Sequence, residues 1–147
     1  MEEDLNFTEK RPYNTREKKK KQPTYRKLIR LELADELYDK IQQIIMIQKK
    51  YRDPYYSAKD LAKELQTNTR YLSAVINSRF GMNFSELKNK YRINEALHLL
   101  TDKRYKDKNI EEISMMVGFA NRQSFYASFY KFVGLTPYSY RLENSQK

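Results

Sequence analysis

The stretch GFANRQSFYASFYKFVGLTP, residues 118–137, decides the fold because a turn, a helix cap and a two-faced helix follow one another in it without a gap. Gly118 supplies the flexible backbone that a tight turn needs, and Asn121 is placed to cap the next helix with its side-chain oxygen. Gly134 is placed to end that helix, and Thr136-Pro137 to cap and start another. This order indicates the second half of a helix-turn-helix.

The helix predicted after Asn121 separates apolar from polar side chains. The apolar ones recur at helical spacing and are predicted to face the core: Phe125, Phe129, Phe132 and Val133. The other side holds polar or amphipathic side chains: Arg122, Gln123, Tyr126 and Tyr130. Arg and Gln can present paired hydrogen-bonding groups to guanine and adenine edges, so this side is a candidate DNA-reading surface.

The same pattern occurs earlier in the chain. Asn68 is predicted to cap a helix with the sequence TRYLSAVINSRF, and Gly81 to end it, both at a shift of 53 residues from Asn121 and Gly134. Further pairs coincide at this shift: Leu72 with Phe125, Ile76 with Phe129, Phe80 with Val133, and Met82 with Leu135. Upstream, Leu61 matches Ile113 at a shift of 52. Two helix-turn-helix units are therefore predicted in tandem.

The remaining segments also read as helices, and the predicted fold class is all-α with about seven helices. Residues 34 to about 50 carry an apolar stripe at helical spacing, and Asp53-Pro54 breaks that helix. Capping boxes are predicted at Ser57, Asn83 and Asn109. We expect residues 1–33 to be a basic disordered arm, and residues 34–147 to be one domain: a first unit at 57–84, a linking helix at 84–102 and a second unit at 109–137.

The net charge of +10 and the isoelectric point of about 9.6 indicate a polyanionic partner, either nucleic acid or an acidic membrane surface. Residues 10–30 hold ten Lys or Arg and one acid, whereas residues 1–9 hold four acids and no base. The start of the chain is thus either a solvated leader, an arm that gathers phosphates without reading sequence, or a docking segment for a partner.

Composition argues against several other functions. The chain has no cysteine and one histidine, so we expect no disulfide, no metal site and no cofactor. His98 lies beside an apolar stripe and is interpreted as an ordinary helix residue, and Glu111-Glu112 as a helix start. Nothing in the sequence suggests an enzyme. Because no long apolar run or signal peptide is visible, a cytoplasmic, nucleoid-associated protein is expected.

Two segments carry a resemblance to a known family: LAKELQTNTRYLSAVINSRFGMNFSELKNKYRINEALHLL, residues 61–100, and IEEISMMVGFANRQSFYASFYKFVGLTPYSYR, residues 110–141. They resemble the AraC-type (AraC/XylS) DNA-binding domain, in which two helix-turn-helix units flank a linking helix. The lead-in Tyr51-Arg52-Asp53-Pro54, followed by LSAVIN and NF, is further similar to versions in Bacteroidetes sensor-regulators. The resemblance covers residues 57–141.

The resemblance implies that both capped helices enter successive major-groove segments on one face of double-stranded DNA, with the linking helix setting their separation. It assigns these residues to base or phosphate contacts: Arg70, Ser73, Asn77, Arg122, Gln123, Ser124, Tyr126 and Lys131. Asn68, Asn121 and Tyr140 are expected to be supports, and Arg141 is undecided. Ala74 and Ala127 replace longer polar side chains and should read little. RNA polymerase or a regulatory protein is a further candidate partner.

Two classes of function follow. The first is a sequence-specific transcriptional regulator; the alternative is a non-catalytic adaptor or architectural protein that binds nucleic acid without specificity. The thirteen tyrosines could form a stacking surface for single strands, but most fall at spacings that serve core or phosphate contacts. The residues before the first unit are too few for the ligand-binding barrel of many family members, so no small-molecule sensor is expected.

Overall fold

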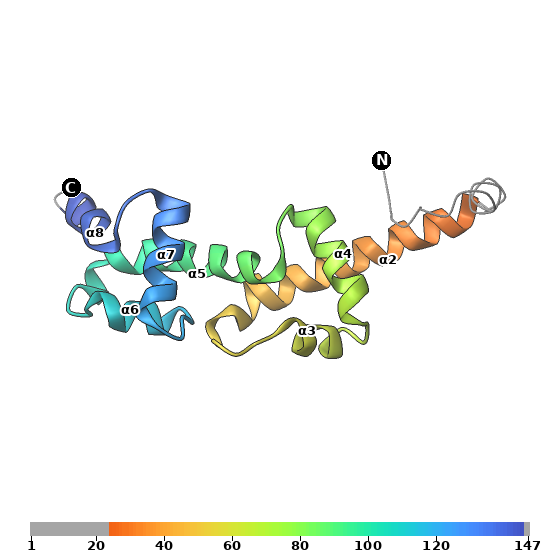
Figure 1. Ribbon diagram of the computed structural model, residues 1–147, viewed down its shortest axis with the longest axis horizontal. Helices are drawn as coiled ribbons and strands as arrows, with labels where there is room; N and C mark the ends of the chain where they lie inside the picture. The colour runs from red at the N-terminus through yellow and green to blue at the C-terminus, as the bar shows by residue number, and fades with distance from the viewer. Residues whose placement is uncertain (1–23, 146–147) are drawn as a thin grey trace. The chain divides into compact units, whose positions relative to one another are not determined.

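The computed structural model describes residues 24–145, and the regular structure in this range is helical (Figure 1). Seven α-helices occur there: α2 (Thr24–Gln42), α3 (Ala58–Glu64), α4 (Thr69–Phe80), α5 (Phe84–Thr101), α6 (Ile110–Met116), α7 (Arg122–Val133) and α8 (Pro137–Ser145). A π-helix follows α2 at Gln43–Ile47, and short 3-10 helices lie at Lys50–Arg52 and Lys103–Tyr105. The predicted all-α class is confirmed for this part of the chain. No helix within it is long and apolar enough to cross a membrane.

Helix α2 begins earlier than the sequence suggested. The prediction placed residues 1–33 in a disordered arm, but residues 24–33 are helical, while residues 1–23 lie outside the described range. The physical reason is that this segment is rich in Leu, Arg, Lys and Glu, which are good helix formers, so a helix nucleated further along can extend back through it. The chain divides into two parts, residues 1–36 and 37–147, and both helix-turn-helix units belong to the second part.

The first and second units repeat each other as predicted. We name α3 and α4 the first unit, and α6 and α7 the second. The bounds of α4 and α7 differ by 53 at both ends, and those of α3 and α6 differ by 52. The side-chain oxygen of Asn68 accepts a hydrogen bond from the Tyr71 N–H (2.7 Å), and that of Asn121 accepts one from the Ser124 N–H (2.8 Å). Both predicted caps are therefore confirmed.

The other predicted helix boundaries also have the expected geometry. Capping boxes are present at Ser57, Asn83 and Asn109, where the N3 carboxylate accepts from the cap N–H in return. Gly81 and Gly134 end α4 and α7 with φ values of 73° and 82°, in the left-handed region that glycine adopts without cost. These boundaries depend on residues within one helical turn, which is why the sequence predicts them.

The turns inside the two units share one left-handed position. Gly118 has a φ of 112°, and the residue 52 positions earlier, Gln66, has a φ of 57°. Glycine is required in the second turn for another reason: a Cβ at Gly118 would lie 2.3 Å from the carbonyl oxygen of Tyr51. The turn of the second unit thus lies directly against the segment that precedes the first unit.

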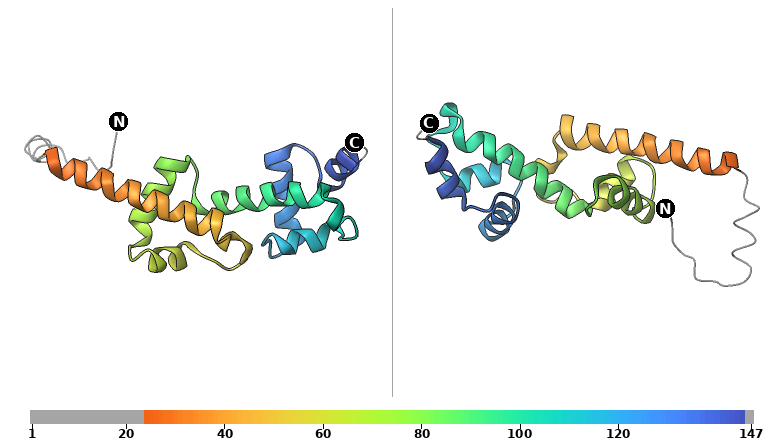
Figure 2. Two further views of the ribbon diagram at one scale, coloured as in Figure 1. Left: turned by 180° about the vertical axis from the view of Figure 1, so that it is seen from behind. Right: turned by 90° about the horizontal axis from the view of Figure 1, so that it is seen from above.

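The core of the second unit forms around the C-terminal half of α5, with α6, α7 and α8 in contact with this helix (Figure 2). Its buried members are Ile93, Ala96, Leu100, Ile113, Val117, Phe119, Phe125 and Phe129. The prediction that Phe132 faces this core is wrong, since its side chain is 38% exposed. Helical spacing predicts which way a side chain points, but not whether other residues bury it. Near the C-terminal end of α7, the side chains packed on the core are Val133 and, from α8, Tyr140.

Candidate nucleic-acid interface

Helices α4 and α7 present matching exposed faces. In the shift of 53, Arg70 corresponds to Gln123, Ala74 to Ala127, and Asn77 to Tyr130, and all six are exposed. The opposite faces carry the buried residues Leu72, Val75 and Ile76 on α4 and Phe125 and Phe129 on α7. Each helix is therefore anchored by one side and offers the other to a partner.

The exposed face of α4 brings together the three residues assigned to the first unit. The amide of Asn77 donates to the backbone oxygen of Ser73 (2.9 Å), so these two lie side by side one turn apart. Arg70 is exposed in the first turn and forms no hydrogen bond or ion pair with the described residues. Its guanidinium can therefore bind a phosphate or a base edge without giving up an internal partner.

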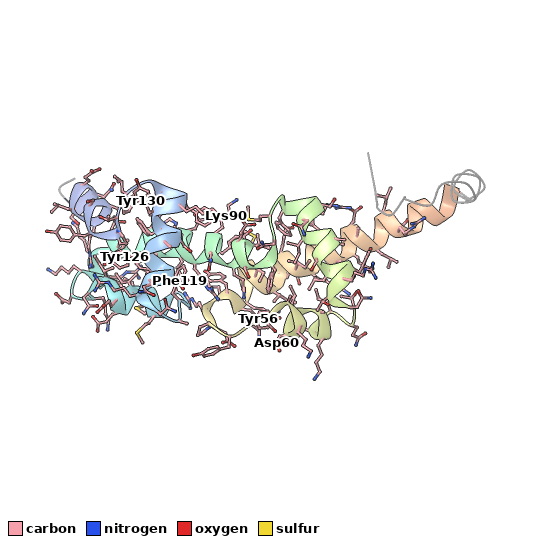
Figure 3. All side chains as sticks on the ribbon, viewed as in Figure 1. Tyr56, Asp60, Lys90, Phe119, Tyr126 and Tyr130 are labelled. Carbon is pink, nitrogen blue, oxygen red and sulfur yellow. The ribbon has the colours of Figure 1, made fainter. Side chains whose placement is uncertain are left out.

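On α7, Arg122 and Tyr126 form a small exposed cluster with α6. The Arg122 guanidinium donates to the Glu111 carboxylate (3.2 Å) and lies 4.8 Å from the centre of the Tyr126 ring. Tyr126 is half-buried and packs edge to face on Phe125, whereas Tyr130, one turn later, is 63% exposed (Figure 3). Tyr126 thus lies between the buried side and the polar side of α7.

Lys131 is also paired. Its Nζ lies 3.2 Å from a carboxylate oxygen of Glu86, which connects α7 to the first turn of α5. The other oxygen of Glu86 accepts from the Asn83 N–H in the capping box. This backbone hydrogen bond first, and the bond from Lys131 second, hold the pKa of Glu86 below its usual value. Lys131 therefore contacts a neighbouring element as well as lying beside the exposed face.

Ser124 is exposed and follows Gln123 directly in the first turn of α7. It lines an open pocket between α5, the turn of the second unit and the segment before α3; the pocket is lined by Pro54, Ser85, Lys88, Asn89, Arg92, Phe119, Ala120 and Ser124. In the shift of 53, Ser124 corresponds to the half-buried Tyr71, and not to an outer position of α4. The structure thus does not bring Ser124 onto the register that Arg70 and Gln123 share.

Sequence reasoning missed the role of Arg92, one of the two buried polar residues in the described range. Its Nε donates to the Tyr51 carbonyl (2.6 Å), its Nη2 to the Asp53 carbonyl (3.2 Å), and its Nη1 to the Asn89 side chain (3.0 Å). Burial lowers the pKa of this guanidinium. The two carbonyl acceptors lie 41 and 39 positions earlier, so no local pattern could have shown these contacts.

A second missed feature repeats between the units. Lys88, five residues after the Asn83 cap, donates to the carbonyl of Tyr56 (2.7 Å). Arg141, five residues after Thr136, donates to the carbonyl of Lys108 (2.7 Å), and also to those of Leu100 and Tyr105. Each acceptor directly precedes the capping box of its unit. Arg141 is therefore a support, as is Tyr140, whose ring packs on Phe129 at 5.8 Å.

Glu95 joins the segment before α3 to α5. It accepts hydrogen bonds from the Tyr51 hydroxyl (2.9 Å) and from Arg52, and Lys49 lies 3.9 Å away. Burial acts to raise the pKa of Glu95, but the hydrogen bonds from Arg52 and Tyr51 and the charges of Arg52 and Lys49 outweigh it, so the pKa is lowered. Residues 49–53 are therefore held on the linking helix by two side chains of opposite charge, the carboxylate of Glu95 and the guanidinium of Arg92.

Comparisons with known proteins identify the family. Residues 61–143 match the model of a family described as a helix-turn-helix domain. The C-terminal domain of the two-component response regulator yesN from Fusobacterium nucleatum is similar in structure, with a TM-score of 0.63 and 29% identity over 71% of this chain and 96% of that one. The C-terminal domain of AraT, a response regulator from Geobacillus stearothermophilus, gives a TM-score of 0.60 and 30% identity over 66% and 78%.

Curated relatives agree with these structures. The HTH-type transcriptional regulator YtdP from Bacillus subtilis is 33% identical over 82 residues, and the melibiose operon regulatory protein from Escherichia coli K12 is 28% identical over 95 residues. The matches cover 56% and 65% of this chain but only 10% and 30% of these relatives. The matched family is one of DNA-binding regulator domains and not an enzyme family. With its two capped units on one linking helix, the chain belongs to the AraC-type helix-turn-helix family of DNA-binding domains.

Proposed function

We propose that the chain is a sequence-specific transcriptional regulator that inserts α4 and α7 into successive major-groove segments of double-stranded DNA. The observation that carries this proposal is that the two helices have the same length, the same cap and an exposed face at the same register. They are joined by α5, whose 18 residues span about 27 Å. That length is compatible with two readers placed about one DNA turn, ~34 Å, apart.

Within this proposal, Arg70 and Gln123 read bases. They occupy equivalent positions in the first turn of their helices, where the N-terminal residues of a recognition helix contact base edges. Arg suits the two acceptors of guanine, and Gln suits the donor and acceptor of adenine. Ser73 and Asn77 lie on the same face of α4 one and two turns further on. Ala74 and Ala127, at equivalent exposed positions of the two helices, have short side chains without a hydrogen-bonding group for base edges.

Arg122 and Lys131 are assigned to phosphates. Each is held in the unbound chain by an exposed ion pair, with Glu111 and Glu86 respectively. Exposed pairs of this kind contribute little to stability because solvent and salt screen them, so exchange of the carboxylate for a DNA phosphate costs little. The carboxylates would keep the two cations oriented until DNA arrives. Tyr126, which supports the Arg122 guanidinium, would act with it; Ser124 is the weakest member of the assigned set because it lines the pocket.

A binding-site selection tests the proposal. Duplexes bound from a random library should share a sequence, and that duplex should displace labelled protein at moderate salt at least about a hundredfold better than a scrambled one. Equal displacement by both would leave the non-specific adaptor as the correct function. RNA polymerase or a regulatory protein on the nucleoid is proposed as a further partner of the DNA-bound chain.

Substitution of Gln123 then tests the assignment of readers. Gln123→Ala should weaken binding to the selected duplex by about 5–150-fold, the cost of about 1–3 kcal/mol for losing one base contact, and should relax preference at a few positions only. The matched control is Gln48→Ala, which removes an exposed Gln outside both units and should leave binding unchanged. A uniform loss on all sequences would remove Gln123 from the reading set.

The basic N-terminal segment is proposed to add affinity without specificity. Residues 10–21 contain seven Lys or Arg, all upstream of α2. Deleting residues 1–23 should lower affinity for selected and scrambled duplexes by the same factor, and should flatten the dependence of affinity on salt. A change in the selected sequence after this deletion would contradict the role given to this segment.

A further inference from the structure

We propose that Arg92 fixes the spacing and relative angle of α4 and α7, and thereby the separation between the two DNA segments that the chain recognises. The inference rests on the proposed function for its DNA consequence, but its structural part can be tested without DNA. Arg92 is a positioning residue here, because its side chain lies in the interior and not on the exposed faces of the reading helices.

Arg92 holds the segment that leads into the first unit. With 6% of its surface exposed, it donates to the carbonyls of Tyr51 and Asp53 from the middle of α5. These two carbonyls belong to the segment that leads into α3, six and four residues before the Ser57 cap. The position of the first unit along α5 is therefore tied to the guanidinium. Glu95, one turn further along α5, holds the same segment through Tyr51 and Arg52.

The turn of the second unit packs on the same guanidinium. The Arg92 guanidinium carbon lies 5.5 Å from the centre of the Phe119 ring, and Phe119 is a 3% exposed residue in the turn between α6 and α7. Beside it, Gly118 approaches the very carbonyl of Tyr51 that Arg92 binds. Figure 3 labels Phe119 at this junction, next to the segment before α3. One guanidinium thus contacts the lead-in of the first unit, the linking helix and the turn of the second.

Arginine at position 92 makes contacts that lysine or methionine could not make there. Arginine stays charged when buried, and its planar fork reaches several acceptors at once while its face lies on an aromatic ring. Lysine would replace the planar fork by a compact ammonium and would not stack on Phe119 in the same way, and methionine would leave both carbonyls without a donor. The ion pair between α7 and α5, Lys131 to Glu86, is exposed and accordingly weak.

The absence of cysteine makes a direct distance measurement possible. Ser73→Cys and Ala127→Cys place one spin label on the exposed face of each reading helix, and pulsed dipolar spectroscopy of the full chain without DNA then gives the distribution of distances between them. We expect a single narrow distribution with Arg92 present. Arg92→Met should at least double its width, and Arg92→Lys should fall between the two.

Arg141→Met is the matched control. Arg141 likewise donates three hydrogen bonds, all of them to backbone carbonyls, but its acceptors are Leu100, Tyr105 and Lys108, which border the second unit only. Its loss should lower the thermal midpoint while leaving the distance distribution narrow. An unchanged distribution in Arg92→Met, or equal broadening in Arg141→Met, overturns the proposal. If Arg92→Met has lost its helical signal, Phe119→Leu replaces it, since this variant keeps every hydrogen bond of Arg92; there too, an unchanged width counts against the proposal.

The DNA consequence is tested on unlabelled protein with the duplex selected by the unmodified chain, and with versions that have one base pair inserted or removed at its centre. The unmodified chain should lose affinity about tenfold or more on either altered duplex, comparable to a mismatched base pair. Arg92→Met should bind the three duplexes with affinities that differ by no more than about threefold, while Arg141→Met should keep the original preference. If Arg92→Met leaves the ratio of affinities for the original and altered duplexes unchanged, the spacing role is refuted. Failure to select any duplex would instead count against the proposed function, and the label distances would still decide what Arg92 does.

Discussion

Replacing Gly118 by alanine should destabilise the protein far more than the same change at the other two glycines. Gly118, Gly81 and Gly134 all have positive φ, of 112°, 73° and 82°. Around Gly81 and Gly134, however, an added Cβ would meet nothing within 4 Å. At Gly118 it would lie 2.3 Å from the Tyr51 oxygen and 2.8 Å from the Arg52 Cα, both backbone atoms that cannot rotate away.

The magnitudes can be worked out from these surroundings. Backbone strain in a left-handed alanine costs about 1–3 kcal/mol, and the smaller entropy of the unfolded chain returns about 0.4–1 kcal/mol. Gly134→Ala should therefore cost about 1 kcal/mol. Gly118→Ala adds the displacement of the segment before α3, which overpacking data put at about 1–3 kcal/mol, and it weakens the 2.6 Å bond from Arg92 to Tyr51. We expect a total of about 3–5 kcal/mol.

Urea denaturation followed by circular dichroism at 222 nm measures the difference. With a slope of about 2 kcal/mol per molar urea, Gly118→Ala should move the midpoint about 1–2 M further than Gly134→Ala. Gly81→Ala serves as a second control and should behave like Gly134→Ala. Equal midpoints for the variants at 118 and 134 would refute the reasoning, because they would mean that the close approach to Tyr51 does not exist in solution.

Three further predictions concern single side chains. Gln66→Gly should raise the free energy of unfolding by up to about 1 kcal/mol, because Gln66 holds a φ of 57° that glycine adopts without strain; a loss of stability in urea would contradict this. Asn121→Ala should cost about 1 kcal/mol through loss of its cap, whereas Gln123→Ala in the same turn should leave the urea midpoint unchanged. Glu95 has a lowered pKa in the folded chain, so its contribution is complete above the unfolded value of about 4.3 and is lost as pH falls through the folded value. Glu95→Gln should therefore be less stable than the unmodified chain at pH 7, but should approach its stability once the pH is below the folded pKa of Glu95. A difference in stability that does not change with pH would contradict this role of Glu95.

Much of the fold could be predicted because it rests on short-range chemistry. A cap such as Asn68 or Asn121 acts on an N–H three residues away, and a glycine such as Gly134 ends a helix through its own backbone freedom. The repeat then follows, because two units with the same local signals must form the same helices. The exposed register shared by Arg70 and Gln123 was predictable for the same reason, while their contacts with DNA stay predictions.

The errors occurred where local chemistry gives no answer. The sequence of residues 24–33 favours a helix as much as its charge favours disorder, so the start of α2 could not be read from composition. Phe132 has the right direction for burial, but no side chain of the core covers it enough, and cover depends on the placement of other elements. Likewise, nothing near Lys131 in the sequence indicates Glu86 as its partner, 45 positions earlier.

The sequence by itself thus determined most helix ends, the tandem repeat and the exposed faces of α4 and α7, since each depends on residues within one or two helical turns. Only the tertiary structure decided how the second unit is placed against the segment before the first. That placement depends on the Arg92 guanidinium, the Tyr51 carbonyl and the bare backbone of Gly118, which are separated by 26 to 67 positions along the chain. Contacts over such separations form only when the whole chain has folded, so no periodicity in the sequence records them.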